Sequence, residues 1–311
     1  MKRQIAILGS SSHIAKGLIN NFLRYRGYNL HLYTRSANKV YYFLGGRGED
    51  YRIHQRYDVL MNYKYNVLIN CVGVGTASKL QGDYTKYFTV NEEYDNLAIG
   101  YLCKYPNALY ISFSSGVVYG KDYTKPANKN TTNKIPVNQI VKENYYSIVK
   151  LNSEAKHRSF ENLRIVDLRI FSYFSRFIDL TDNYFVCEII NCILNKKTFI
   201  TNDANITRDY IHPKDLFLII KKCIEIGNLN TAFDVTSAKS VKKREILDYF
   251  SENYGLKYKI VPSVENASPT GQKNIYYSKY NKLAQFGYKP ALTSMETIKQ
   301  ESRYILNNRK S

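Results

Sequence analysis

The stretch that decides the fold covers residues 5–18 and reads "IAILGSSSHIAKGL". Four apolar residues lead to Gly9, which is followed by three serines and then by a pattern typical of a helix. A buried strand that ends in glycine and turns into a helix is where dinucleotide-binding folds hold a pyrophosphate, because the helix N-terminus offers free N–H groups to an anion. That fingerprint contains three glycines, and here only Gly9 stands in place. By itself the stretch is compatible with a phosphate loop or with a polar turn.

Strand and helix patterns alternate downstream of this stretch. Buried-strand patterns are expected at 3–8, 27–35 (ending near Thr34), 66–72, 108–115 and 163–170, and helical spacing at 13–26, 83–104 and 143–160, with a polar loop at 120–142. Strands separated by helices indicate a parallel sheet covered on both faces, and such connections are right-handed. The sequence therefore predicts a Rossmann-type doubly wound α/β fold.

The last third of the chain is mixed. Helices are expected at about 183–195, 213–226, 241–254 and 294–308, short strands near 198–201, 232–236 and 258–261, and a polar loop at 262–275. We expect residues 1–171 to form the Rossmann domain, with 206–228 returning to it. Residues 172–205 and 229–311 are then expected to form a smaller mixed α/β domain that binds substrate.

Composition places the chain among ordinary globular proteins. Of 311 residues, 44% are hydrophobic and 23% charged, and no run of 18 apolar residues indicates a transmembrane helix. The apolar run near the N-terminus is too short for a signal sequence. Five cysteines without CxxC spacing favour reduced thiols and a cytoplasmic protein, and no metal site is predicted.

The net charge of +19 has more than one interpretation. Lys and Arg are dispersed rather than gathered in a block, so we expect no nucleic-acid partner. Compositional drift and attraction of a phosphorylated substrate both remain open.

A candidate acid/base pair occurs in "ENYYSIVKLNSEAK" (143–156). Tyr146 and Lys150 are four apart on a predicted helix, so their side chains share one face. An ammonium group beside a phenol stabilises the phenolate, and such a tyrosine can move a proton at an alcohol or carbonyl oxygen while hydride moves at the carbon. With 30 tyrosines, chance is the alternative. The other Tyr-x-x-x-Lys pair, Tyr210 and Lys214, encloses Pro213, which makes a continuous helical turn doubtful.

Ser115 in "ISFSSGVVYG" (111–120) follows a buried strand. Hydroxyl groups at the carboxyl ends of parallel strands lie where open α/β sheets place ligands. Ser115 is therefore a candidate donor to the oxygen that the tyrosine protonates, or else an ordinary serine between strand and loop.

Taken in order, these motifs resemble the extended short-chain dehydrogenase/reductase superfamily of nucleotide-sugar epimerases, dehydratases and reductases. The resemblance rests on the Gly9 loop, "NCVGVG" (70–75), "SSGVVYG" (114–120), "YYSIVK" (145–150) and "RDYIHPKD" (208–215), and continues in "FDVTSAKSVKKREIL" (233–247) and "KLAQFGYKP" (282–290). Each motif alone is weak, but their common order is specific.

The resemblance implies a role for each matching residue. Tyr146, Lys150, Ser115 and Asn91 would be catalytic, with Lys150 lowering the pKa of Tyr146 and binding the nicotinamide ribose. Arg208 would reach the substrate diphosphate, with a surface ion pair to Asp209 as the alternative. Ser172 stands where relatives often have an asparagine that contacts the substrate. The cofactor would contact Gly9, Ser11, Ser12, His13, Ile14, Asp58, Val59, Cys71, Val72 and Gly73, together with Tyr146 and Lys150.

The loop of the superfamily has the spacing Gly-x-x-Gly-x-x-Gly, which puts Ser12 and Ala15 at the second and third glycines. The Ser12 hydroxyl would either donate to a phosphate oxygen or cap the helix. His13 would lie near the cofactor phosphates or simply open the helix.

The end of the second strand, "HLYTRSANK" (31–39), predicts the cofactor. NAD-preferring members carry an acidic residue there for the ribose hydroxyls. Arg35 and Ser36 take its place and suit a 2′-phosphate, which favours NADP(H) over NAD(H). The alternative is that Arg35 merely caps an exposed turn.

The residues after Ser115 bear on the reaction. Dehydratases of the superfamily carry an Asp-Glu pair there, and relatives that epimerise beside the ketone carry a cysteine where this chain has Val117. We therefore predict an NADPH-dependent reductase of a nucleotide-linked 4-keto sugar, plausibly a 6-deoxy sugar, acting in polysaccharide biosynthesis. The alternatives are a 4-epimerase with tightly bound NAD and a non-catalytic NADP-binding regulator or scaffold. Relatives dimerise through helices matching 83–104 and 143–160, so a homodimer is expected.

Overall fold

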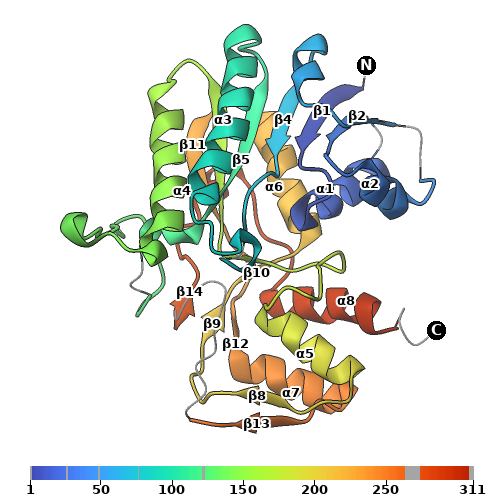
Figure 1. Cartoon of the computed structure of the whole chain (residues 1–311), viewed down its shortest axis with the longest axis vertical. Helices are drawn as coiled ribbons and strands as arrows, with labels where there is room; N and C mark the ends of the chain where they lie inside the picture. The colour runs from blue at the N-terminus through green and yellow to red at the C-terminus, as the bar shows by residue number, and fades with distance from the viewer. Residues whose placement is uncertain are drawn as a thin grey trace.

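The computed structural model describes residues 2–25, 27–47, 50–75, 77–120, 123–262 and 274–307. A large lobe built on a seven-stranded sheet lies above a smaller lobe (Figure 1). Every pairing in the large sheet is parallel. The strand order is β11-β6-β5-β4-β1-β2-β3, with bounds β1 Arg3–Leu8, β2 Tyr28–Tyr33, β3 Tyr51–His54, β4 Val67–Asn70, β5 Leu109–Ser115, β6 Arg164–Ile170 and β11 Asn230–Val235.

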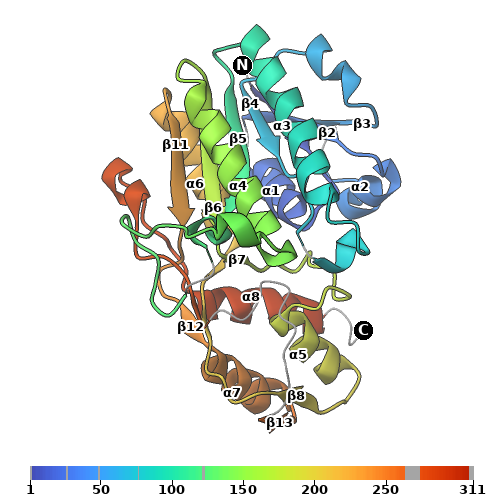
Figure 2. The same ribbon diagram turned by 60° about the vertical axis from the view of Figure 1, so that its left-hand side comes forward.

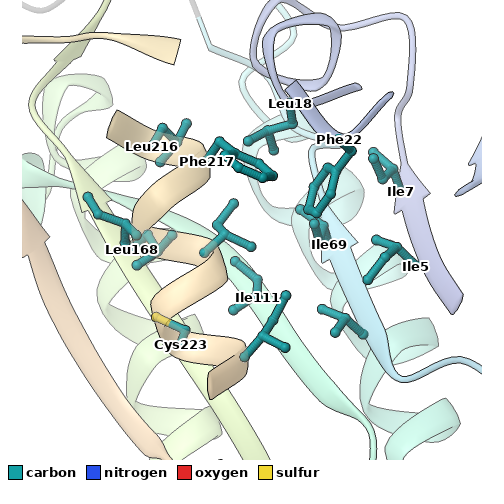
Figure 3. Close-up of a cluster of buried hydrophobic side chains, with 14 of the residues drawn as sticks. Ile5, Ile7, Leu18, Phe22, Ile69, Ile111, Leu168, Leu216, Phe217 and Cys223 are labelled. Carbon is teal, nitrogen blue, oxygen red and sulfur yellow. The ribbon is translucent and has the colours of Figure 1, made fainter. Parts of the chain in front are cut away.

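Successive side chains of each strand point to opposite faces of this sheet, and helices pack on both faces. Ile5 and Ile7 of β1 face a core shared with α1, α2 and α6, which Figure 3 shows between α1 and α6. Ala6 and Leu8 face the opposite side, where α3 packs and α4 lies beside it (Figure 2). The helices are α1 His13–Arg24, α2 Ala37–Leu44, α3 Lys86–Lys104, α4 Lys142–Ser159 and α6 Pro213–Ile226. The predicted doubly wound fold is confirmed.

The smaller lobe contains three helices and short strands around a second apolar core. Its elements are β7 Ser172–Tyr173, α5 Phe185–Leu194, β8 Phe199–Thr201, β9 Thr207–Arg208, β10 Tyr210–Ile211, β12 Val241–Lys242, α7 Lys243–Tyr254, β13 Tyr258–Ile260, β14 Ile275–Tyr276 and α8 Ser294–Asn307. Short 3-10 helices are η1 Asp58–Asn62, η2 Ala77–Leu80, η3 Gly116–Tyr119, η4 Val137–Gln139 and η5 Lys282–Phe286.

The sequence-based division of the chain is wrong at one strand. β11 pairs with β6 at the edge of the large sheet, although residues from 229 onward were expected in the smaller domain. The helix α2 and the strand β3 were not predicted. Most of the expected loop at 262–275, and the last residue of the expected helix at 294–308, lie outside the described residues. As expected, Tyr210 and Lys214 do not share a helical turn, because α6 begins at Pro213.

Among the described residues, no helix is both long and apolar enough to cross a membrane. All five cysteines are free thiols in the structure.

The sheet changes winding direction between β1 and β4, which are hydrogen-bonded neighbours. Connections from the two strands leave in opposite directions, and this opens a crevice at their carboxyl ends. Gly9 follows β1 with φ of +72°, and a Cβ there would lie 3.0 Å from the carbonyl carbon and oxygen of Cys71 and from Cγ2 of Val72. The loop after β1 therefore packs directly on the chain that leaves β4.

Within the large lobe, a buried charged network joins α3, α4 and β6. Nδ1 of His157 lies 2.8 Å from Asp167 and Nε2 lies 2.6 Å from Asp95. Burial lowers the pKa of His157, but the hydrogen bonds and charges of Asp167 and Asp95 outweigh it and raise the pKa to about 9. Tyr110 donates to Asp95 at 3.0 Å and accepts from Asn70 at 3.1 Å, so the network reaches the end of β4.

The packing of Gly9 predicts that Gly9→Ala lowers the free energy of unfolding by about 1–3 kcal/mol, since a left-handed φ and a 3.0 Å contact with backbone act together. Gly73→Ala is the matched control, because a Cβ at Gly73 meets no atom within 4 Å. Urea unfolding of both variants measures the difference. Equal loss in the two variants would contradict the packing argument.

The raised pKa of His157 predicts a fall in stability with increasing pH. The imidazolium is stabilised in the folded protein, so its contribution is complete below about pH 6.5 and is lost as pH rises through about 9. The total change from this group is about 3 kcal/mol. Subtracting the unfolding curve of His157→Gln from that of the wild type, between pH 6 and 10, isolates it.

His13 and His31 do not interfere with this measurement. Burial lowers their pKa values to about 3 and about 4, so their stabilising effect is lost only as pH falls below about 6.5. Parallel curves for wild type and His157→Gln above pH 6.5 would show that His157 is not charged in the folded protein.

Candidate active site

A cleft of about 1270 Å³ lies between the two lobes at the carboxyl ends of the strands. It is large enough for a dinucleotide together with a second ligand, since drug-sized ligands fill roughly 300–1,000 Å³. The predicted site residues that line it are Ser12, His13, Ile14, Cys71, Val72, Gly73, Ser115, Tyr146, Lys150, Ser172 and Arg208. The fold thus brings eleven of the predicted residues to one cavity.

Tyr146 lies on α4 and faces this cleft. Burial raises the pKa of Tyr146 above its usual range, and a hydrogen bond with Ser115 only partly opposes the shift. The ring of Tyr146 lies 5.1 Å from that of Tyr87. Its neighbour Tyr145 packs instead against Tyr84 and Phe88, and it is not among the lining residues.

Lys150 is held one helical turn further along α4. Its Nζ donates to Oδ1 of Asn91 at 2.9 Å and to the carbonyl of Phe113 at 3.0 Å, and lies 5.8 Å from the centroid of the Tyr146 ring. Burial lowers the pKa of Lys150, and nearby carboxylates oppose that shift. Burial outweighs the lowering of the Tyr146 pKa that was expected from Lys150.

Asn91 is buried in α3 and donates through Nδ2 to the carbonyl of Tyr87 at 2.6 Å. It does not line the cleft within the described part of the chain. Its oxygen is therefore free to accept from Lys150, and Asn91 acts on the site through that lysine.

Ser115 ends β5, and its Oγ lies 3.2 Å from the hydroxyl of Tyr276. The next residue must be small, because a Cβ on Gly116 would lie 2.4 Å from the Phe171 ring. Val117 and Val118 follow, and both are buried in an apolar cluster. The positions directly after Ser115 therefore supply no acid or base.

Tyr276 is the main residue that sequence reasoning missed. It is 1% exposed, lines the cleft, and pairs across β14 and β9 with Arg208, whose guanidinium carbon lies 5.8 Å from its ring centroid. Burial raises the pKa of Tyr276 to about 12. No sequence signal marks it among 30 tyrosines, since a pairing between two-residue strands 68 positions apart brings it to Ser115.

Arg208 is buried in the cleft wall rather than exposed. It donates to the carbonyl of Thr207 at 3.1 Å. Asp209 accepts instead from Ser237 and Ser294, each at 3.1 Å, so a surface ion pair between Arg208 and Asp209 is not what the structure contains. Ser172 reaches the same cleft from β7.

At the other end of the cleft, Ser12 caps α1 by accepting from the N–H of Ala15 at 3.4 Å. Ala15 is fully buried, and the closest helix packing falls at Gly17, where a Cβ would lie 2.0 Å from the hydroxyl of Tyr173. His13 lies beside Tyr173 with ring centroids 4.8 Å apart. Burial lowers the pKa of His13 to about 3, so a neutral imidazole faces the cleft.

Some predicted residues stand outside the lining. They are Gly9, Ser11, Arg35, Ser36, Asp58, Val59 and Asn91. Arg35 is exposed between β2 and α2. Burial raises the pKa values of Tyr57 and Tyr94, and the charge of Arg35 partly opposes that shift. Asp58 is exposed and ion-paired with Arg56.

Two observations indicate that the end of the cleft beside α1 suits a dinucleotide. Gly9 leaves no space for a side chain between the two loops, which lets main chain approach a pyrophosphate. Nε2 of His13 is buried and has no hydrogen-bond partner among the described residues, as expected of a group that a polar ligand completes.

Solved structures similar to this one are nucleotide-sugar enzymes. A UDP-N-acetylglucosamine 4-epimerase from Methanobrevibacter ruminantium superposes with a TM-score of 0.80 and 18% identity over 99% of this chain and 100% of that one. A UDP-glucose 4-epimerase from Thermotoga maritima gives 0.79 and 14%, over 98% and 99%. A dTDP-glucose 4,6-dehydratase from Bacillus anthracis gives 0.77 and 15%, over 99% and 98%. These identities establish the fold alone.

The comparison with curated protein sequences finds no match. The family model described as "NAD dependent epimerase/dehydratase family" matches residues 5–235, which include the Gly9 loop, Ser115, Tyr146 and Lys150. Because that match covers well over half of the chain, the protein belongs to the NAD-dependent epimerase/dehydratase family.

Proposed function

We propose that the protein is an NADPH-dependent reductase that transfers hydride to C4 of a nucleotide-linked 4-keto sugar. The observation that carries this proposal is the convergence of Tyr146, Ser115 and Lys150 on one cleft wall, without a further acid or base directly after Ser115. Such a site supports one hydride transfer and one proton transfer at a single carbonyl.

Each side chain has a distinct task in this reaction. Tyr146 is protonated at neutral pH because burial raises its pKa, and the protonated phenol is the form that delivers a proton to the reduced oxygen. Ser115 hydrogen-bonds the same oxygen and polarises the carbonyl. Lys150, fixed by Asn91 and the Phe113 carbonyl, binds the cofactor ribose and holds positive charge near the phenol. The nicotinamide, when bound, supplies the hydride.

A buried arginine lies in the small-lobe wall of the cleft. Arg208 is buried in the wall and its planar fork suits a diphosphate. Tyr276 lies between Arg208 and Ser115, so it would contact the sugar between the diphosphate and the reacting carbon.

The preference for NADPH rests on Arg35 and Ser36 at the end of β2. Ser36 precedes α2 without using its side chain as a cap, so its hydroxyl remains available for a 2′-phosphate. Similar structures were solved with NAD, including the Bacillus anthracis dehydratase, and they leave the choice of cofactor to experiment.

A nucleotide-sugar 4-epimerase is the second candidate, favoured by the 4-epimerases among the similar structures. It needs the same tyrosine, lysine and serine but keeps NAD bound throughout turnover. Purified protein that carries NAD(H) and does not oxidise added NADPH would establish the epimerase instead. Unchanged function in Tyr146→Phe would favour a non-catalytic regulator.

We also propose a homodimer formed through α3 and α4. Val141 and Leu151 are 46% and 37% exposed at the start and in the middle of α4. Single exposed apolar side chains are also ordinary on a monomer, so the proposal rests mainly on the resemblance to relatives that dimerise through the matching helices. Sedimentation of the purified protein tests this, and a monomer at micromolar concentration would exclude it.

Turnover of a panel of nucleotide-linked 4-keto sugars tests the reductase proposal. Tyr146→Phe is expected to lower kcat by about 10²–10⁴-fold, the range of general acid catalysis. Tyr145→Phe is the matched control and should retain activity, because its ring packs away from Ser115. Absence of NADPH oxidation with every member of the panel, or equal loss in both variants, would contradict the proposal.

The cofactor proposal predicts that Arg35→Gln raises the KM for NADPH by about tenfold while changing the KM for NADH little, since one charge-assisted contact with a phosphate is removed. Arg56→Gln removes an equally exposed arginine that pairs with Asp58, and it should leave the ratio of the two KM values unchanged. A ratio that Arg35→Gln does not alter would show that Arg35 only borders the turn.

A further inference from the structure

A second cleft, of about 710 Å³, lies away from the catalytic residues. Its walls come from α1, from the end of α2, from the segment 176–180 and from α8, elements that Figure 1 shows close together where the two lobes meet. Ile178 lines both clefts, so the two cavities share a wall. A volume of this size suits a small organic ligand.

The lining of the second cleft is cationic. Arg24, Arg47 and Arg176 line it, and no acidic residue does so in the described part of the chain. Arg176 is committed to Glu301, at 2.6 Å, whereas the guanidinium of Arg47 donates to the neutral amide of Asn20 at 3.1 Å. Arg24 and Arg47 are both exposed toward solvent. No carboxylate of the described residues forms an ion pair with Arg24 or Arg47, so these two charges are placed to meet an external anion.

Two further lysines, Lys16 and Lys39, lie near this lining. The ammonium of Lys16 lies 5.9 Å from the centroid of the Phe43 ring, and the exposed Asp179 is the acidic group that acts on it. Burial lowers the pKa of Lys16, the charge of Lys39 adds to that shift, and Asp179 opposes it.

Three aromatic rings, those of Phe43, Phe177 and Tyr304, also line the cleft. Phe43 and Phe177 meet edge to face with centroids 5.2 Å apart. The guanidinium carbon of Arg176 lies 3.2 Å from the centroid of the Tyr304 ring. Planar bases stack on such rings and on guanidinium groups, and phosphates bind arginine forks.

We propose that the second cleft binds a nucleoside monophosphate. The phosphate is held by Arg24 and Arg47, and the base stacks among Phe43, Phe177 and the Arg176–Tyr304 pair. Because α1 and α2 belong to the large lobe and α8 to the small one, the bound nucleotide joins the lobes beside the wall formed by Ile178. This site is separate from the substrate diphosphate contact proposed at Arg208.

Equilibrium dialysis of AMP, GMP, CMP and UMP against the full chain at low ionic strength tests the proposal. At least one of the four is expected to bind, and Arg24→Gln with Arg47→Gln should weaken that binding about tenfold or more, because two charge-assisted contacts are lost. The double variant Arg52→Gln and Arg244→Gln removes the same charge from exposed positions outside both clefts and should bind like the wild type. Arg208→Gln, altered only in the main cleft, should also retain this binding.

Four outcomes would overturn the proposal. They are absence of binding by all four nucleotides, equal loss in the two double variants, loss of all binding in Arg208→Gln, and binding of ribose 5-phosphate as tight as that of the nucleotides. Phe43→Leu keeps both arginines and provides a second variant if the double variant fails to fold. It should weaken nucleotide binding without weakening that of ribose 5-phosphate, and the opposite pattern would exclude stacking. None of these results depends on turnover at the main cleft.

Discussion

Parallel hydrogen bonding of β4 with β1 on one side and β5 on the other is the constraint on which the rest of the structure depends. It places the carboxyl ends of three strands at one edge of the sheet. Gly9 and Cys71 follow two of those ends and Ser115 is the last residue of the third, so the residues proposed as phosphate loop, cofactor wall and catalytic hydroxyl are neighbours in space. The small lobe closes the cleft from the other side, and its lining residues include Arg208, Ser172 and Tyr276.

Charge is distributed unequally around this edge. Behind Ser115, Glu154 accepts from Ser114 at 2.5 Å and pairs with Arg169, which also donates to Tyr119 at 2.9 Å. These groups are largely buried and mutually satisfied, as buried charges must be if they are not to destabilise the fold. Arginines also line the two clefts, Arg208 in the main one and Arg24, Arg47 and Arg176 in the second. Under the two proposals, part of the net charge of +19 serves to bind anions, although dispersed surface lysines account for much of it.

Much of the site was predictable because its signals are local or follow from topology. The four-residue spacing of Tyr146 and Lys150 fixes a shared helix face, and a serine at the end of a buried strand fixes its edge of the sheet. Strand β11 was misplaced because a pattern of apolar residues does not say which sheet a late strand joins.

Other features depend on contacts between distant segments. Tyr276 reaches Ser115 only through the pairing of β14 with β9, and the tightest helix packing at Gly17 depends on Tyr173. The second cleft requires α1, α2 and α8 to be assembled before its arginines lie near one another. No spacing rule within one segment contains that information.

Isotope transfer tests the central claim, that the cleft performs redox chemistry at C4 of a sugar, most directly. Reduced cofactor carrying deuterium at the transferable position of its nicotinamide would be incubated with a nucleotide-linked 4-keto sugar, and the product examined by NMR. The account predicts deuterium at C4 of the sugar. Deuterium at any other carbon, or no transfer of deuterium to the sugar, would contradict it.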